Sequence, residues 1–256
     1  MNNHELCPIH HALLTSMDNS LPNQRRPIIA IDGPAGAGKS TVSRLIADYL
    51  GLLYLDTGAM YRAVAWLVLQ SGLEVNDEPG IATLVSQAQI KLIAPQQSDS
   101  PIQVQINGQD VTKEIRTPEV TAQVSAVAKL AAVRQALVEQ QRSWGQQGGI
   151  VADGRDIGTH VFPDAELKIF LTASATERAR RRQQDLLKQG ETNVSLEELE
   201  QSIKQRDHQD STRQIAPLRK AESAIEIYTD GLSIDQVVEE IIKLYHGCLA
   251  EATIKY

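Results

Sequence analysis

The chain has 256 residues, a hydrophobic fraction of 42% and a formal net charge of −7. This length suits one α/β domain with an insertion, and the apolar fraction is sufficient for a buried core, which argues against overall disorder. The negative charge argues against general binding of nucleic acid or anionic membranes, because both require a broad basic surface.

The ends of the chain indicate its compartment. Residues 1–26 are mostly polar, and their apolar island at 12–14 is too short for a secretory signal, so we expect a disordered tail. Cys7 and Cys248 are the only cysteines and have no metal-binding spacing, which favours a reducing, cytoplasmic environment. No stretch reaches the roughly 18 apolar residues of a membrane span.

A glycine-rich loop lies between an apolar run at 28–31 and a helical pattern. Gly33 and Gly38-Lys39-Ser40 are separated by four residues, which is the spacing of a phosphate-binding P-loop. The backbone N–H groups of such a loop converge on an anion, the lysine adds a positive charge, and the serine hydroxyl can ligate Mg²⁺. The residues expected at this phosphate site are Gly33, Pro34, Ala35, Gly36, Ala37, Gly38, Lys39, Ser40 and Thr41.

The next segment predicts a second parallel strand. Residues 52–56 read as a buried strand and 59–70 as a helix, and alternating strands and helices imply a parallel sheet. Ligands gather beyond the carboxyl ends of such strands, where Arg62 is expected. A solvent-facing position for Arg62 is equally compatible with the spacing.

The pattern changes at residue 77. Residues 89–93 and 102–106 alternate apolar and polar with period two, as half-buried antiparallel strands do. Asn107-Gly108 predicts a type I′ turn leading to a short third strand. We therefore interpret 77–116 as an inserted subdomain, with a loop at 94–101.

The chain then returns to the central sheet. Thr117-Pro118 predicts a helix start, and a second helical stretch covers 131–147. Residues 149–152 form a short strand that ends in Asp153-Gly154-Arg155-Asp156. Charges so close to a buried strand require partners, in a functional site or in a salt-bridged structural turn.

Another strand is expected at 166–172, and Ser174 begins a capping box for the following helix. That helix carries Arg178, Arg181 and Arg182 at a spacing that places them on one face. In an acidic chain such a cluster suits an anion, although a solvated helix face is also possible.

The last third predicts a mobile lid. Ser195 caps a helix that leads into residues 206–213, whose arginines we expect to follow a helix end and to close over bound phosphates, excluding water. A last strand at 224–228 and a helix capped by Ser233 complete the chain. A P-loop ringed by separate arginines is typical of an enzyme that brings two phosphorylated substrates together.

Together these segments resemble the bacterial cytidylate kinases, of the P-loop nucleoside monophosphate kinase group, over about residues 27–245. The resemblance rests on IDGPAGAGKS (31–40), DTGAMYR (56–62), GQDV (108–111), IRTPEV (115–120), ADGRDIGT (152–159), FPDA (162–165) and the lid signature Arg206-Asp207, Asp210-Ser211, Arg213 and Ala216-Pro217-Leu218.

The resemblance implies an α/β fold: a P-loop NTPase core at 27–76 and 117–256, with a parallel sheet flanked by helices. An antiparallel monophosphate-binding subdomain at 77–116 and a mobile lid at about 185–216 would complete it. The implied reaction is phosphoryl transfer from ATP, with Mg²⁺, to CMP or dCMP in pyrimidine nucleotide metabolism. A monomer that binds small-molecule nucleotides, and neither nucleic acid nor membrane, is expected.

The resemblance also implies residue roles. Ser125, Arg134 and Asp156 would contact the cytosine, Thr57 and Arg62 would lie at the acceptor nucleotide, Arg206 and Asp210 would reach its sugar, and Arg155 and Arg213 would hold phosphates. The residues expected to act in catalysis are Lys39, Arg155, Arg206 and Arg213. The family often has serine at the position of Thr57, which keeps the hydroxyl and adds a methyl group.

Two alternatives remain open at this point. A kinase for UMP or another small acceptor is the nearest one. A P-loop switch protein or nucleic-acid motor is the alternative from another class, although the chain has no N-K-x-D element and its charge of −7 does not favour a nucleic-acid track.

Overall fold

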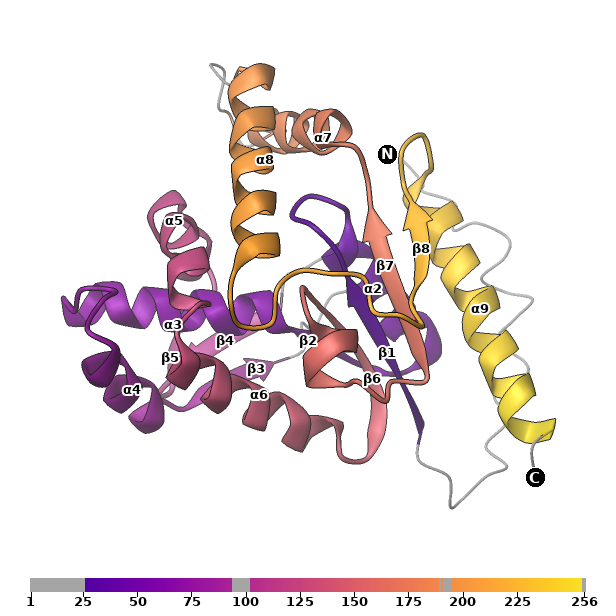
Figure 1. Ribbon diagram of the computed structural model, residues 1–256, viewed down its shortest axis with the longest axis horizontal. Helices are drawn as coiled ribbons and strands as arrows, with labels where there is room; N and C mark the ends of the chain where they lie inside the picture. Colours follow the sequence, from indigo (N-terminus) through magenta and orange to yellow (C-terminus); the bar gives the residue numbers. More distant parts are fainter. Residues whose placement is uncertain (1–25, 94–101, 189, 191–194, 255–256) are drawn as a thin grey trace, which may run out of the picture.

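The computed structural model describes residues 26–93, 102–188, 190 and 195–254. The expected tail, apart from Arg26, and the expected loop at 94–101 lie outside these residues. The central sheet is parallel throughout, with strand order β2-β6-β1-β7-β8 (Figure 1). Its strands are β1 (Arg26–Asp32), β2 (Leu53–Asp56), β6 (Gly148–Gly154), β7 (Leu167–Thr172) and β8 (Ile225–Tyr228).

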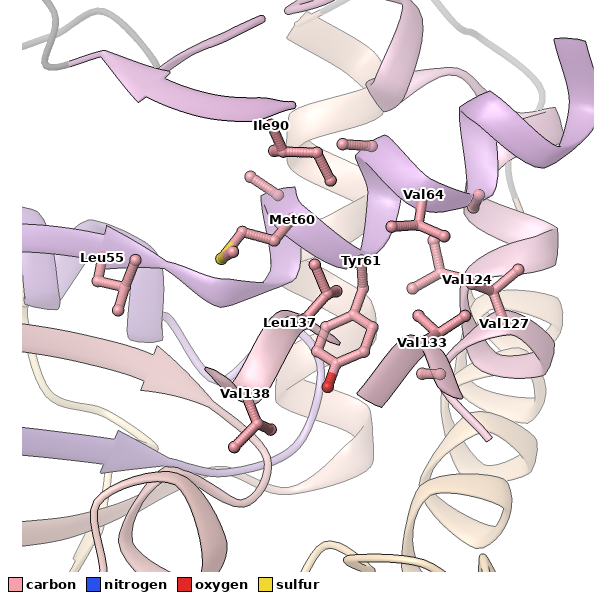
Figure 2. Packing of buried hydrophobic residues seen from close by; sticks show 14 of the residues in the cluster. Leu55, Met60, Tyr61, Val64, Ile90, Val124, Val127, Val133, Leu137 and Val138 are labelled. Carbon is pink, nitrogen blue, oxygen red and sulfur yellow. The ribbon is translucent and has the colours of Figure 1, made fainter. Parts of the chain in front are cut away.

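Helices cover both faces of this sheet, which confirms the expected fold class. Successive residues of β1 enter opposite clusters: Ile29 and Ile31 pack with α2 (Lys39–Leu50) and α9 (Ile234–Ile254), whereas Ile28 and Ala30 pack with α3 (Thr57–Ser71) and α6 (Ala131–Gly145). A strand buried on both faces is uniformly apolar, as this one is. Figure 2 shows Met60, Tyr61 and Leu137 within the cluster on the side of α3 and α6.

A smaller antiparallel sheet of order β3-β4-β5 lies beside α3. It consists of β3 (Ile90–Ile93), β4 (Gln103–Ile106) and β5 (Gln109–Asp110). The predicted turn is confirmed, because Asn107 and Gly108 have φ angles of 51° and 84°. Val104 and Ile106 belong to the same hydrophobic cluster as α3 and α6, so this sheet shares the main core.

One helix in this region was not expected. Helix α4 (Glu78–Gln87) precedes β3, and the Asp77 carboxylate caps it by accepting from the backbone N–H of Gly80 at 3.0 Å. Ile81 and Val85, one turn apart, are its buried residues and join the main cluster. Pro79 and Gly80 in the first turn obscured the helical pattern in the sequence.

Two further helices carry the predicted caps. Thr117 caps α5 (Pro118–Val127), and Ser195 caps α8 (Leu196–Thr212) through the backbone N–H of Glu198. Helix α8 packs against α7 (Ala175–Lys188) at the carboxyl-end side of the sheet (Figure 1). The helix that we expected to end near residue 206 continues to Thr212, so Arg206 lies on its last two turns rather than beyond its end.

Two short helical turns complete the described fold: η1 (Glu114–Arg116) and η2 (Ile157–Val161), which is π-helical. The latter is separated from β6 by Arg155 and Asp156 and was not predicted. Within the described ranges, no helix is both long and apolar enough to cross a membrane.

Candidate active site

The phosphate-binding loop joins β1 to α2. Three of its glycines have positive φ angles, of 150° at Gly33, 78° at Gly36 and 88° at Gly38. A Cβ atom on Gly33 would lie 1.9 Å from the carbonyl oxygen of Leu171, so no other residue fits between β1 and β7 there. The loop is therefore built for backbone N–H groups to face an anion at the start of a helix.

Lys39 lies within this loop in a buried position. Its ammonium donates to the carbonyl oxygen of Pro34 at 2.7 Å. Burial lowers the pKa of Lys39 well below its usual range, the nearby charge of Arg155 lowers it further, and the charges of Asp153 and Asp32 oppose this effect. A bound phosphate would supply the negative charge that favours the ammonium form.

The carboxyl ends of β2 and β6 meet beside the loop. Asp56 and Asp153 are neighbours in the sheet register, and the Thr57 hydroxyl donates to the backbone carbonyl of Asp153 at 2.7 Å. Burial and the charge of Asp56 raise the pKa of Asp153, whose Oδ1 accepts from the Tyr54 hydroxyl at 2.9 Å. Asp153 was not among the expected site residues, although its place at the end of an apolar strand was a usable signal.

A buried carboxylate holds two arginines together. Asp156 Oδ2 pairs with Nη2 of Arg134, and Asp156 Oδ1 lies 3.0 Å from Nη2 of Arg213. The Arg134 guanidinium carbon lies 5.7 Å from the ring centre of Tyr61. Arg134 is 3% exposed, yet its Nε and Nη1 atoms find no hydrogen-bond partner among the described residues. Buried donors without partners are rare in proteins and require an acceptor, which water or a ligand can supply.

Helix α8 supplies further charged groups. Nε of Arg155 donates to Oδ2 of Asp210 at 2.9 Å, and Nε of Arg213 donates to the carbonyl oxygen of Ala216 at 2.6 Å. Nε of Arg206 is buried and has no partner within the described chain. Burial lowers the pKa of Arg206, and the charge of Arg155 lowers it further, whereas the charges of Asp210 and Asp207 oppose this effect.

Arg62 reaches the same region from α3. Its Nη1 donates to the Thr121 hydroxyl at 2.7 Å. Burial and the charge of Arg206 lower the pKa of Arg62 to about 10. Arg62 is thus directed toward the cationic side chains of the site rather than toward solvent alone. Ser125 is half-buried on α5, the helix that carries Thr121.

The three arginines expected on one face of α7 have different surroundings. Arg178 is buried, donates to the Ala35 carbonyl oxygen at 3.0 Å and forms a bidentate pair with Asp207 of α8. Arg181 instead contacts Glu177 and Thr229, and Arg182 is exposed. Arg178 therefore ties the phosphate loop to α8, a role that its spacing alone did not reveal.

The described residues contain no group of three or more His, Cys, Asp or Glu that could hold a metal. Mg²⁺ in phosphate sites is usually held by substrate phosphates and one or two protein oxygens. Ser40 is exposed on the first turn of α2, beside Lys39, and offers such an oxygen. This donor set fits an ion that arrives with a nucleotide.

The chain is similar in sequence to known proteins of one family. A family model described as Cytidylate kinase matches residues 29–247. A "Bifunctional pantoate ligase/cytidylate kinase" of Nostoc sp. is 62% identical over 235 residues, which are 92% of this chain and 44% of that protein. A protein of the same description from Synechococcus elongatus is 63% identical over 231 residues, 90% of this chain and 44% of that protein. The chain thus spans less than half the length of these relatives.

Among solved structures, the shikimate kinase from Acinetobacter baumannii in complex with shikimate has a TM-score of 0.45 at 16% identity, over 87% of this chain and 94% of that chain. This similarity is too distant to support any conclusion beyond the sheet topology described above.

Proposed function

The chain belongs to the cytidylate kinase family, and from this membership we propose that it transfers the terminal phosphoryl group of ATP to CMP or dCMP, giving ADP and CDP or dCDP. The names of both relatives include cytidylate kinase, and the family match covers most of this chain.

One observation carries the choice of acceptor. Asp156 offers acceptor oxygens beside Arg134, whose buried Nε and Nη1 donors lack partners in the described part of the chain. Cytosine has the complementary groups, an amino donor at C4 and acceptors at N3 and O2. Its amino group would donate to Asp156, and its acceptors would receive the free donors of Arg134. Ser125, on α5, completes the proposed base contacts.

Uracil, the base of the nearest alternative acceptor, fits the same groups poorly. It has a carbonyl at C4 and an N–H at N3, so Asp156 would face an acceptor and Arg134 would lose a partner. Sites built on buried hydrogen bonds reject such analogues, because each unsatisfied buried group costs about 1–3 kcal/mol.

We assign the phosphates to the remaining cations. Phosphoryl transfer requires alignment of donor and acceptor together with neutralisation of negative charge. The P-loop from Gly33 to Thr41 would cradle the donor phosphates, with Lys39 as a point charge. Arg155, Arg206 and Arg213 would neutralise charge on the transferring group, and Thr57 and Arg62 would hold the acceptor nucleotide.

When bound, Mg²⁺ would neutralise charge on the nucleotide phosphates, with Ser40 as its protein ligand. Helix α8 would act as part of the lid, with Arg206 and Asp210 at the acceptor sugar, and closure of residues 185–216 would exclude water from the phosphates. Residues 77–116 would form the acceptor subdomain.

The function is tested by a screen of monophosphate acceptors with MgATP, in which ADP formation is measured. We expect turnover that depends on CMP or dCMP. Turnover with UMP or another acceptor alone would favour the alternative kinase, and ATP hydrolysis independent of any acceptor would favour a switch protein or a motor.

A further inference from the structure

The π-helical turn η2 begins directly after Asp156, and its first amides are capped from another part of the chain. Oδ1 of Asp32 accepts from the backbone N–H of Ile157 at 2.7 Å, and Oδ2 of Asp32 accepts from that of Gly158 at 2.7 Å. Asp32 is the last residue of β1, next to Gly33 of the phosphate loop, and is 3% exposed.

This arrangement releases the carboxylate of Asp156 from capping the turn. An aspartate immediately before a helical turn ordinarily caps that turn with its own carboxylate. Asp156 occupies this position, and its backbone carbonyl accepts from His160 and Val161 at 2.9 and 3.1 Å. Its carboxylate makes no cap and instead pairs with Arg134 and Arg213.

The other end of η2 is held by a charge of opposite sign. Nε of Arg142, on α6, donates to the carbonyl oxygen of Val161 at 3.0 Å, and its Nη2 donates to that of His160 at 2.6 Å. A carboxylate at the amino end and a guanidinium at the carboxyl end both suit the helix dipole. π-Helical turns are rare and often lie at functional sites.

We propose that Asp32 is a positioning residue for base selection: it caps η2 in place of Asp156, so that the Asp156 carboxylate stays available to the base of the acceptor nucleotide. Arg142 has the same role at the far end of the turn. This inference rests on the proposed function of the site. It also means that one residue connects the phosphate loop, which would hold the donor, to the group that would read the acceptor.

The test uses Asp32→Asn, which keeps the shape of the side chain but leaves only one acceptor oxygen for two N–H groups. Asp156 then becomes the nearest replacement cap. We expect the ratio of kcat/KM for CMP over UMP to fall about tenfold, the size of one lost hydrogen bond, mainly through a higher KM for CMP; because both acceptors are measured with the same enzyme and ATP, any effect of Asp32 on the charge of Lys39 cancels in this ratio. Arg142→Ala should reduce the ratio in the same direction.

Two comparisons separate positioning from a general loss of stability. Glu166→Gln is the matched control, because Glu166 accepts from the backbone N–H of Ile28 at 2.7 Å at the opposite end of β1 and should leave the ratio unchanged. In an Asp156→Asn background, Asp32→Asn should have no further effect on the ratio, since it acts through Asp156.

The possible outcomes distinguish this inference from the proposed function. If the wild type has no preference for CMP, the proposed function is wrong. The cap can then still be tested by hydrogen exchange of the Ile157 and Gly158 amides, which should be faster in ligand-free Asp32→Asn than in the wild type. If the wild type prefers CMP and both Asp32→Asn and Arg142→Ala keep the full preference, the inference is overturned. If Asp32→Asn does not fold, the ratio of kcat/KM for CMP over UMP in Arg142→Ala tests the inference instead.

Discussion

Nε of Arg155 donates to Oδ2 of Asp210 at 2.9 Å, and this ion pair joins the end of β6 to the last turns of α8. The adjacent residue Asp156 pairs with Arg213, where α8 ends. The two residues that directly follow β6 thus hold one helix through charges of opposite sign. The helix proposed as part of the lid is therefore attached to the acceptor side even without nucleotides.

The Arg155–Asp210 pair should restrain α8. We expect Asp210→Asn to destabilise the protein by about 1–3 kcal/mol, because it leaves a partly buried guanidinium without its charged partner. It should also speed hydrogen exchange over residues 206–213. Glu239→Gln, at an exposed ion pair on α9, is the control and should change stability by less than about 0.5 kcal/mol.

In the wild type, bound CMP and a non-hydrolysable ATP analogue should slow hydrogen exchange over residues 206–213. Unchanged exchange with both bound would contradict the lid.

Lys39→Ala should lower kcat at least about a hundredfold, because the phosphate site loses its fixed positive charge. The fold should persist, since Lys39 is a buried amine whose charge is costly in the ligand-free protein. Steady-state kinetics together with thermal unfolding would test both statements. Lys243→Ala, on the exposed face of α9, is the control and should retain full activity. Near-normal turnover of Lys39→Ala would remove Lys39 from the phosphate site.

Gly33→Ala should prevent assembly of the phosphate loop, because its Cβ would meet the Leu171 carbonyl oxygen at 1.9 Å. Gly51→Ala is a matched control: Gly51 also has a positive φ angle, 59°, but open space around its Cβ position. We expect the control to cost only about 1–2 kcal/mol, from backbone strain. Equal melting temperatures for the two variants would show that the contact with Leu171 is not limiting.

Stability should depend on pH through Asp32. Burial raises the pKa of Asp32 from 3.8 to about 6, and the negative charge of Asp156 raises it as well. The hydrogen bonds donated by the backbone N–H groups of Gly158 and Ile157 lower this pKa and so offset part of the increase. The folded protein therefore binds more protons than the unfolded chain between about pH 4 and 6, so the free energy of unfolding falls as pH rises through that window. A shift of two pKa units corresponds to about 3 kcal/mol.

The measurement for this prediction is urea unfolding of the wild type and Asp32→Asn from pH 4.5 to 7. The stability of the wild type relative to the variant should decrease as pH rises through the folded-state pKa of about 6 and become constant about one pH unit above it. Asp153, whose pKa is also raised by burial, contributes the same sign in both proteins and cancels in the difference. A difference that does not vary with pH would mean that Asp32 titrates normally.

Local sequence signals predicted much of the fold. Residues that cap their own helix, such as Thr117 and Ser195, act over three positions and are visible in the sequence. The P-loop is similarly compact, and its glycines have the positive φ angles that their spacing implies. Helix α4 was missed because Pro79 and Gly80 disfavour a helix interior, yet both are tolerated in a first turn that Asp77 caps.

The candidate site was less accessible from sequence, because its supporting contacts join distant residues. Asp32 and Ile157 are 125 positions apart, and Arg178 and Ala35 are 143 apart, so no spacing rule connects them. The π-helical turn has no period of its own and depends on Asp32 and Arg142 for its end groups. Asp153 could have been found from its place at the carboxyl end of an apolar strand beside the P-loop.

The central claim is that Asp156 and Arg134 select cytosine, and the most direct test is kcat/KM for CMP and for UMP in the wild type and in Asp156→Asn. We predict a large preference for CMP in the wild type. Asp156→Asn should narrow it, because an amide can rotate to present either a donor or an acceptor at the C4 position. Equal values for the two acceptors in the wild type would contradict the proposed function, and an unchanged ratio in Asp156→Asn would remove Asp156 from the base site.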